Sequence, residues 1–204
     1  MADIILEKLK LRQTFKRKRS EHGLEDIAKK SQIITQNFLT KLLPQIYSKN
    51  SDKVFGIYSS SGGEVSTNLI IEHFQKNHIH FSYPKIVQIN QHLDFILAQK
   101  DQSFAPNQFY PKILEPISGS KNFPDFIILP LLAFDSDLTR LGMGGGFFDR
   151  TIDFLKKQKT EIITIGLAYE FQRAHDPLPT EKTDQKLDFI VTELGVLPRE
   201  RDVR

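Results

Sequence analysis

The chain alternates short apolar stretches, typical of buried strands, with amphipathic stretches, typical of helices. The most apolar stretch, DFIILPLLAF (125–134), suits the centre of a parallel sheet, because such strands are buried on both faces. Other predicted strands cover 54–59, 78–84 (stopped by Pro84), 161–169 and 186–193, with a strand or hairpin over 86–98. This alternation predicts an α/β fold with a doubly wound, mostly parallel sheet and flanking helices, a Rossmann-like three-layer arrangement.

Four segments show helical spacing of their apolar residues. The predicted helices cover 3–20, 24–43, 66–77 and 151–158. The second is expected to end before Pro44, and the third to open at Ser66 or Thr67. The proline-rich segment 99–123 is expected to be mostly loop. Because the 204 residues contain no repeat and no evident linker, we expect one domain over residues 1–204.

Composition excludes several classes of protein. Hydrophobic residues make up 39% of the chain and charged residues 26%, as in ordinary soluble domains. No window approaches the roughly 18 consecutive apolar residues of a membrane span, and charges interrupt the apolar N-terminal run, unlike a secretory signal. The chain has no cysteine, so disulfides and thiolate chemistry are excluded. We expect a cytoplasmic monomer with no membrane partner.

Positive charge is concentrated near the N-terminus. The net charge is +3 and the pI about 9.0, and residues 8–19 alone contain seven Lys or Arg. Such a cluster can be a solvated helix face, a nucleic-acid patch or part of a pocket for a polyanionic small molecule. The predicted helix carries Ile5 and Leu9 in its apolar stripe, while Lys8 and Arg12, four residues apart, project from one face.

The stretch RLGMGGGFFDR (140–150) follows the most apolar strand and precedes a helix, and it places four glycines within five positions. A glycine loop at the carboxyl end of a strand exposes N–H groups beside a helix N-terminus, which favours phosphate binding. The GxGxxG pattern is not met, because Phe147 stands at the last glycine position. Arg140 can bind phosphate, and Asp149 facing a phosphate requires a divalent cation between them. A magnesium–nucleotide site is predicted, and a hinge is the plain alternative.

Other polar residues carry weaker signals. Glu64 lies in the turn after the strand 54–59 and is expected at the same sheet edge as the glycine loop, although a solvated carboxylate is an equal alternative. Asp184 and Asp188 precede the last predicted strand, where one can join Asp149 at a metal and Asp188 can simply end a loop. The serines of SSSGGE (59–64) lack the GxSxG elbow of hydrolases.

The residues resemble a known family. RLGMGGGFFDR is similar to the RLGxGxGYYDR signature of the 5-formyltetrahydrofolate cyclo-ligases, also called methenyltetrahydrofolate synthetases. Further similarities follow in chain order, and they cover nearly the whole sequence. They comprise Lys8 and Arg12 in a Lys-x-x-x-Arg pattern, YSSSGGEVST (58–67), FSYPKI (81–86), Glu115-Pro116, PLLAFD (130–135) and LPTEKTDQKLDFIVTE (178–193).

The resemblance implies an enzyme that uses MgATP to convert 5-formyltetrahydrofolate into 5,10-methenyltetrahydrofolate, releasing ADP and phosphate. In the chemistry proposed for the family, ATP phosphorylates the formyl oxygen, N10 of the folate attacks the activated carbon, and phosphate leaves. The protein then mainly positions the substrates and neutralises charge.

The same resemblance assigns roles to individual residues. Arg140 and Asp149 would be catalytic, Asp149 and Asp184 would hold Mg²⁺, and Glu64 would hydrogen-bond the pterin. ATP would be bound by Lys8, Arg12, Arg140, Leu141, Gly142, Met143, Gly144, Gly145, Gly146, Phe147 and Phe148. The folate pocket would be lined by Ser59, Glu64, Met143, Gly144, Gly145, Gly146 and Phe147.

The sequence departs from the family pattern at two places. Phe147 and Phe148 stand where the family has paired tyrosines, so the rings remain and the phenol hydroxyls are lost, and Met143 occupies a position that is often aromatic or basic. Two alternatives to the cyclo-ligase remain. One is a nucleotide-binding module without folate chemistry, and the other is a nucleic-acid-binding protein that uses residues 8–19, whereas the resemblance implies no nucleic-acid partner.

Overall fold

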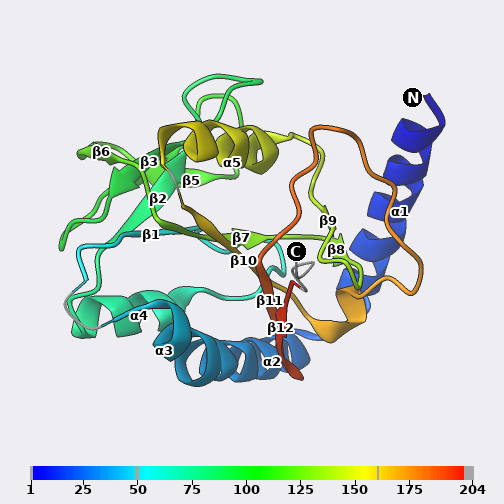
Figure 1. The fold of residues 1–204 in the computed structure, drawn as a ribbon, viewed down its shortest axis with the longest axis horizontal. Coiled ribbons are helices and arrows are strands. Elements are labelled where there is room, and N and C mark those ends of the chain that lie inside the picture. The colour runs from blue at the N-terminus through cyan, green and yellow to red at the C-terminus, as the bar shows by residue number, and fades with distance from the viewer. Residues whose placement is uncertain (1, 49–50, 160, 200–204) are drawn as a thin grey trace.

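The structure is a computed structural model that describes residues 2–48, 51–159 and 161–199 (Figure 1). The predicted domain over residues 1–204 therefore extends at both ends outside the described residues. The helices are α1 (Ala2–Ser20), α2 (Leu24–Asn37), a π-helix (Phe38–Leu42), α3 (Leu43–Ile46), α4 (Asn68–Lys76), α5 (Phe147–Gln158) and a 3-10 turn (Glu170–Gln172). No helix among the described residues is long and apolar enough to cross a membrane.

Most strands form one eight-stranded sheet in the order β12-β11-β10-β7-β1-β2-β3-β6. The strands from β11 to β2 are parallel, and β12, β3 and β6 join antiparallel, so the predicted mostly parallel α/β sheet is confirmed. Its strands are β1 (Phe55–Ile57), β2 (Phe81–Lys85), β3 (Asp94–Leu97), β6 (Lys121–Asn122), β7 (Phe126–Pro130), β10 (Ile163–Leu167), β11 (Phe189–Thr192) and β12 (Gly195–Pro198). Two small antiparallel pairs complete the set, namely β4 (Phe104–Pro106) with β5 (Leu114–Pro116), and β8 (Ala133–Phe134) with β9 (Arg140–Leu141).

Strand β7 occupies the centre because both of its faces are apolar. Phe126 and Ile128 pack into the core shared with α2 and α4, whereas Ile127 and Leu129 pack into the core shared with α5. All four side chains are buried. Figure 1 shows the corresponding layers, with α5 on one face of the sheet and α2, α3 and α4 on the other. The predicted three-layer arrangement follows from this double burial.

Helix α1 lies outside these layers, beside β8 and β9 (Figure 1). It packs through Phe15 against a small core of Leu132, Ala133, Leu141 and Leu178. The predicted apolar stripe was wrong at Ile5 and Leu9, which are 50% and 48% exposed, whereas Lys8 is buried. Lys8 and Arg12 face the protein because Lys8 forms ion pairs there and both side chains line a cavity.

The second helical segment does not end before Pro44 as predicted. The π-helix Phe38–Leu42 follows α2, and α3 continues to Ile46 with the proline in its first turn. The helical backbone runs through the wider π-helical turn into α3 without a break, so Pro44 removes one hydrogen bond of a continuing helix. The N–H of Leu43 still bonds to the carbonyl of Phe38, one residue further back than in an α-helix.

Proline also fails to stop β2, contrary to prediction, because the strand runs through Pro84 to Lys85. Pro84 lies opposite Phe95 of β3 and beyond Ser82, the last β2 residue paired with β1. One edge of the strand has no ladder there, which is where a sheet tolerates proline. Of the segment 86–98, predicted to be a strand or hairpin, only β3 is a strand, and it pairs with β2 instead of forming a hairpin within the segment. The segment 99–123, expected to be mostly loop, holds the three short strands β4, β5 and β6.

The chain direction across the sheet changes between β1 and β7. From β1 the chain crosses to β2 on one side, and later strands β7, β10 and β11 lie on the other side. At such a switch point the connections leave in opposite directions, so a crevice opens at the carboxyl ends of the two strands. The fold therefore places a ligand site beyond Ile57 and Pro130.

Candidate active site

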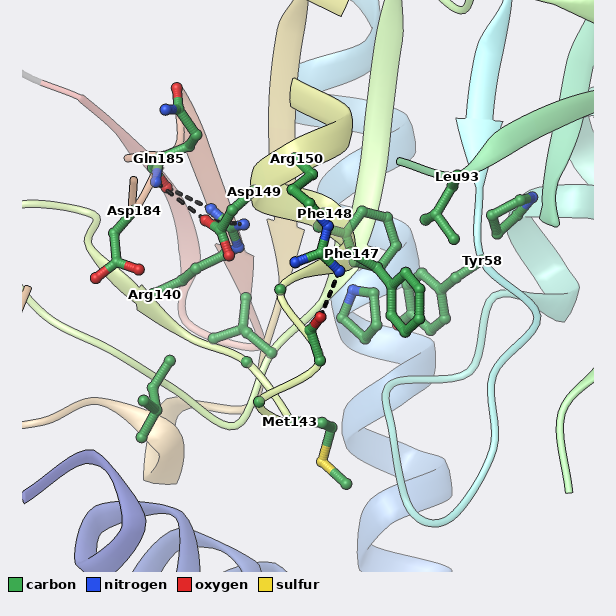
Figure 2. Close-up of a pocket in the computed structure, with 18 of the residues that line it drawn as sticks. Tyr58, Leu93, Arg140, Met143, Phe147, Phe148, Asp149, Arg150, Asp184 and Gln185 are labelled. Carbon is green, nitrogen blue, oxygen red and sulfur yellow. Dashed lines mark hydrogen bonds and ion pairs between the residues drawn. The ribbon is translucent and has the colours of Figure 1, made fainter. Parts of the chain in front are cut away.

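A cavity of about 670 Å³ lies at this crevice (Figure 2). Its walls come from the carboxyl ends of β1, β2 and β7, the inward face of α1, the glycine loop with the start of α5, and residues 181–185. Every residue assigned from the sequence lines it, although their individual roles stay predictions. These residues are Lys8, Arg12, Ser59, Glu64, Arg140, Leu141, Gly142, Met143, Gly144, Gly145, Gly146, Phe147, Phe148, Asp149 and Asp184.

The glycine loop requires glycine at two positions for different reasons. Gly144 has φ of +107°, and a Cβ there would lie 3.4 Å from the Arg12 guanidinium carbon. Gly146 precedes the first residue of α5 with φ of +64°, and a Cβ there would lie 2.7 Å from Nη1 of Arg150. The positive φ would strain any other residue at both positions, and a side chain at Gly146 would also displace the end of Arg150. The loop thus keeps backbone and arginine close together at the N-terminus of α5.

Two cations of α1 reach the cavity from one helical face, as their spacing predicted. Arg12 Nε donates a hydrogen bond to the carbonyl of Gly142 at 3.0 Å. Lys8 Nζ donates to Glu181 Oε2 at 2.7 Å and to Asp184 Oδ2 at 2.6 Å. Burial acts to lower the pKa of Lys8, but the hydrogen bonds and charges of the two carboxylates outweigh it, and the pKa is raised. Lys8 is therefore a charged group of the cavity wall.

Arg140 and Asp149 form a second ion pair, with 2.7 Å between Nη2 and Oδ1. The guanidinium is 4% exposed and also donates to the carbonyl of Gln185, whose own N–H donates to Asp149 Oδ1 at 3.1 Å (Figure 2). Burial lowers the pKa of Arg140, while the neighbouring Asp149 and Asp184 oppose that shift. The pair joins β9, the first turn of α5 and the segment before β11.

The two aspartates predicted to hold a metal lie on the same side of the cavity (Figure 2). Among the described residues, no group of three or more His, Asp or Glu side chains could hold a metal. Each aspartate nevertheless uses only one oxygen, Oδ1 of Asp149 and Oδ2 of Asp184, for hydrogen bonds within the described chain. Two available carboxylate oxygens suit Mg²⁺, which keeps several waters and takes further ligands from substrate phosphates. The chemistry of the two aspartates is therefore that of Mg²⁺ ligands.

Glu64 lines the cavity from the turn after β1. Its Oε2 accepts a hydrogen bond from the N–H of Ser61 at 3.0 Å. Burial raises the pKa of Glu64, while the Ser61 hydrogen bond and the charge of Arg19 partly oppose the shift. Ser59, close by in the same turn, is exposed. A partly desolvated carboxylate of this kind favours a ligand that brings its own hydrogen-bond donors.

Aromatic rings form another wall. The guanidinium carbon of Arg150 lies 5.3 Å from the Phe147 ring centroid, and Tyr110 meets the same ring edge-on at 5.9 Å. Arg150 also donates to the carbonyl of Gly145 at 2.6 Å, so it ties the ring to the glycine loop. Met143 is exposed and extends away from Asp149 in Figure 2. The two phenylalanines thus serve packing without hydroxyl groups.

Several residues of the cavity were not predicted from the sequence, including Arg19, Tyr58, Glu181 and Gln185. Arg19 could have been found, since it is eleven residues after Lys8 and so on the same helical face. Glu181 belongs to a matched segment, but no local pattern connects it to Lys8. Asp188 does not line the cavity and instead accepts hydrogen bonds from the N–H and hydroxyl of Thr164.

The sheet order and the cavity define an open α/β protein with a cationic, glycine-lined ligand site at its switch point. Within that class, the sequence model of the 5-formyltetrahydrofolate cyclo-ligase family matches residues 5–193. The chain belongs to this family of ligases, whose reaction converts 5-formyltetrahydrofolate into 5,10-methenyltetrahydrofolate.

Relatives and solved structures agree with this assignment. The chain is 35% identical to a 5-formyltetrahydrofolate cyclo-ligase of Haemophilus influenzae over 78% of this chain and 84% of that protein. It resembles the NMR structure of Aquifex aeolicus 5,10-methenyltetrahydrofolate synthetase with a TM-score of 0.76 and 30% identity, over 97% and 94% of the two chains. The Mycoplasma pneumoniae synthetase structure has a TM-score of 0.68 and 27% identity, over 92% and 99%.

Proposed function

We propose that the cavity binds MgATP and 5-formyltetrahydrofolate side by side and carries out the cyclo-ligase reaction of the family. The carrying observation is that one cavity brings together a glycine loop, the cations Lys8, Arg12 and Arg140, and the separate carboxylate Glu64. The glycine loop and the cations suit phosphate oxygens, and the Glu64 carboxylate suits the hydrogen-bond donors of a pterin.

The phosphate side is assigned to the residues around the glycine loop. Backbone N–H groups at the start of α5 would receive phosphate oxygens, with the positive end of the helix dipole behind them. Lys8, Arg12 and Arg140 would neutralise the triphosphate, and Asp149 and Asp184 would hold Mg²⁺ through the oxygens they leave free. When bound, Mg²⁺ supplies charge neutralisation at the phosphates.

The folate side is assigned to Glu64, Ser59 and the ring of Phe147. The reduced pterin presents an amino group and a ring N–H side by side, which match the two oxygens of one carboxylate. Phe147 and the exposed backbone of residues 143–146 would face the rest of the folate. The formyl group then lies between the two sides of the cavity.

The proposed chemistry balances within these two substrates. The formyl oxygen attacks the γ-phosphorus of ATP and ADP departs, after which N10 attacks the activated formyl carbon. Phosphate leaves with the former formyl oxygen, and the N10 proton ends on the phosphate. Arg140 would stabilise the transferring phosphoryl group, and Asp149 would keep Arg140 in place through their 2.7 Å ion pair. In this scheme both residues are catalytic.

We further propose that residues 1–204 act as a single catalytic domain and a monomer in the cytoplasm. The single domain is supported by the one eight-stranded sheet, whose strands come from residues 55 to 198. The nucleic-acid alternative is disfavoured because three of the seven cations in residues 8–19, namely Lys8, Arg12 and Arg19, line the cavity, and Lys8 is also buried against two carboxylates.

The deciding experiment follows methenyltetrahydrofolate formation by absorbance from 5-formyltetrahydrofolate with MgATP. Product is expected with both substrates present, together with ADP in equal amount, and neither when one substrate is left out. ATP binding with no folate-dependent turnover would instead support a nucleotide-binding module. Steeply salt-dependent DNA or RNA binding that ignores folate would support the nucleic-acid alternative.

A further inference from the structure

Glu181 is a carboxylate of the cavity wall to which neither the resemblance nor the proposed chemistry gives a role. It lies in the segment between the 3-10 turn and β11, and it lines the cavity beside Asp184. Its Oε2 accepts the 2.7 Å hydrogen bond from Lys8, 173 residues away in the sequence. The ion pair therefore connects the N-terminal helix with the opposite end of the chain.

Lys8 needs such a partner because its side chain is long and flexible. An ammonium group has three donors on a four-carbon stem, and ordering that stem costs conformational entropy. Glu181 and Asp184 take two of the donors, so the third is left for the cavity. The Lys8 side chain is 7% exposed, so it is held in this position within the wall.

The two carboxylates that hold Lys8 differ in what else they do. Asp184 Oδ2 also accepts a hydrogen bond from the N–H of Glu181 at 2.7 Å. Asp184 is in addition one of the two proposed metal ligands. A cation bound to Asp184 would partly neutralise its charge and so weaken its ion pair with Lys8. Glu181 Oε2 has no other hydrogen bond among the described residues, so its hold on Lys8 would persist.

We propose that Glu181 is a positioning residue, which holds the Lys8 ammonium toward the cavity so that its free donor meets a phosphate oxygen of MgATP. This inference rests on the proposed MgATP function. The alternative is that Glu181 competes with phosphate for Lys8, in which case Glu181 would weaken nucleotide binding. The two relations predict opposite signs when the carboxylate is removed.

The test measures MgATP binding by calorimetry without folate, together with KM and kcat for ATP in the full reaction. Glu181→Ala is expected to weaken MgATP binding and raise KM roughly tenfold, as for one lost charge-assisted hydrogen bond, with a smaller change in kcat. Glu181→Gln keeps an acceptor oxygen at the same reach and should restore most of the affinity. Glu181→Asp withdraws the carboxylate by one carbon and should behave like Glu181→Ala, and it preserves the test should Glu181→Ala fold poorly.

A double-mutant comparison separates positioning from general stability. In a Lys8→Ala background, Glu181→Ala should have little further effect on MgATP binding, because the group it positions is gone. Glu72→Ala, which removes an exposed carboxylate from α4 on the far face of the sheet, should leave binding unchanged. Equal or tighter MgATP binding by Glu181→Ala, or a full effect in the Lys8→Ala background, would overturn the inference. Absence of MgATP binding by the unaltered protein would instead refute the proposed function.

Discussion

At the scale of single residues, the cavity is governed by charges that already have partners before any ligand arrives. Lys8 is held by Glu181 and Asp184, and Arg140 is held by Asp149. Removing one member of such a pair leaves the other partly buried and uncompensated. Substitutions here should therefore preserve shape wherever the aim is to test binding.

Asp149→Asn is such a substitution, because the amide keeps an acceptor for Arg140 and Gln185 while losing the charge for a cation. MgATP-dependent turnover is expected to fall by at least a hundredfold with the fold retained, while the free energy of unfolding is lowered because the buried Arg140 loses its counter-charge. The measurement is turnover across a Mg²⁺ titration, with Asp137→Asn, an exposed carboxylate, as the control. Near-normal turnover at ordinary Mg²⁺ would show that Asp149 is not a metal ligand.

Lys8→Ala and Arg12→Ala are each expected to raise KM for ATP, because both cations face the cavity from one side of α1. We expect KM for ATP to rise roughly tenfold or more in each variant, which corresponds to one lost charge-assisted hydrogen bond. Lys10→Ala removes the same charge from the exposed side of the same helix and should leave KM unaltered. If Lys10→Ala matches the other two, net charge and not position is responsible.

Glu64→Gln should weaken folate binding and leave ATP binding nearly unchanged. The amide offers one acceptor and one donor, so it cannot pair with both pterin donors, and kcat/KM for 5-formyltetrahydrofolate should fall at least tenfold, about 1.4 kcal/mol. ATP affinity measured without folate should barely move. The reverse result would place Glu64 on the nucleotide side of the cavity.

The raised pKa of Glu64 also sets the pH dependence of the same step. Folate binding requires the ionised carboxylate, so KM for folate should begin to rise on acidification at a pH above the ordinary carboxyl value of 4.5. The folded chain holds this proton more tightly than the unfolded chain, so stability is lost as pH rises from 4.5 through the raised pKa. Glu64→Gln should remove the shift in KM and be slightly more stable at neutral pH.

At the scale of elements, the glycine loop and α5 act as one unit. Gly144→Val and Gly146→Val should abolish ATP use, because both backbones have positive φ, which strains a branched residue, and the added atoms would push against the guanidinium groups of Arg12 and Arg150. Gly23→Ala, before α2, has open space and no positive φ, and should leave both stability and turnover intact. Unchanged ATP affinity in both valine variants would show that the run is only a hinge.

Element types were readable from the sequence where burial alone decides them, and their ends were not. Strand β7 was predictable because its residues are apolar on both faces. The element ends predicted at Pro44 and Pro84 were wrong, because a π-helical turn carries the helix past Pro44 and the ladder with β1 ends before Pro84. Strand β12 was missed because its four residues, GVLP, have no alternation and are explained only by pairing with β11.

The candidate site was predictable to a similar degree. Its glycines, Asp149 and Lys8 stand in local patterns that the resemblance makes specific. Glu181 was not found, because its place depends on α1 lying against the carboxyl edge of the sheet, whereas Arg19 shares a helical face with Lys8 and was predictable from that spacing. A helix that presents Lys8 inward and leaves Leu9 exposed contradicts the usual amphipathic rule, since its buried face serves ion pairs.

At the scale of the whole molecule, the cavity joins the first helix to the segment before the last parallel strand, so ligand binding should stabilise the entire chain. MgATP at a hundred times its Kd adds about 2.7 kcal/mol to the free energy of unfolding. For a chain of this length, about 2–4 °C per kcal/mol gives a rise in Tm of roughly 5–11 °C. The rise is measured by thermal scans at one ligand concentration, kept the same for each nucleotide and each variant. AMP lacks the β- and γ-phosphates and should give a much smaller shift at equal concentration, and Lys8→Ala should reduce the shift for MgATP but not for AMP. An equal shift for AMP and MgATP would mean that the cations of α1 contribute nothing to nucleotide binding.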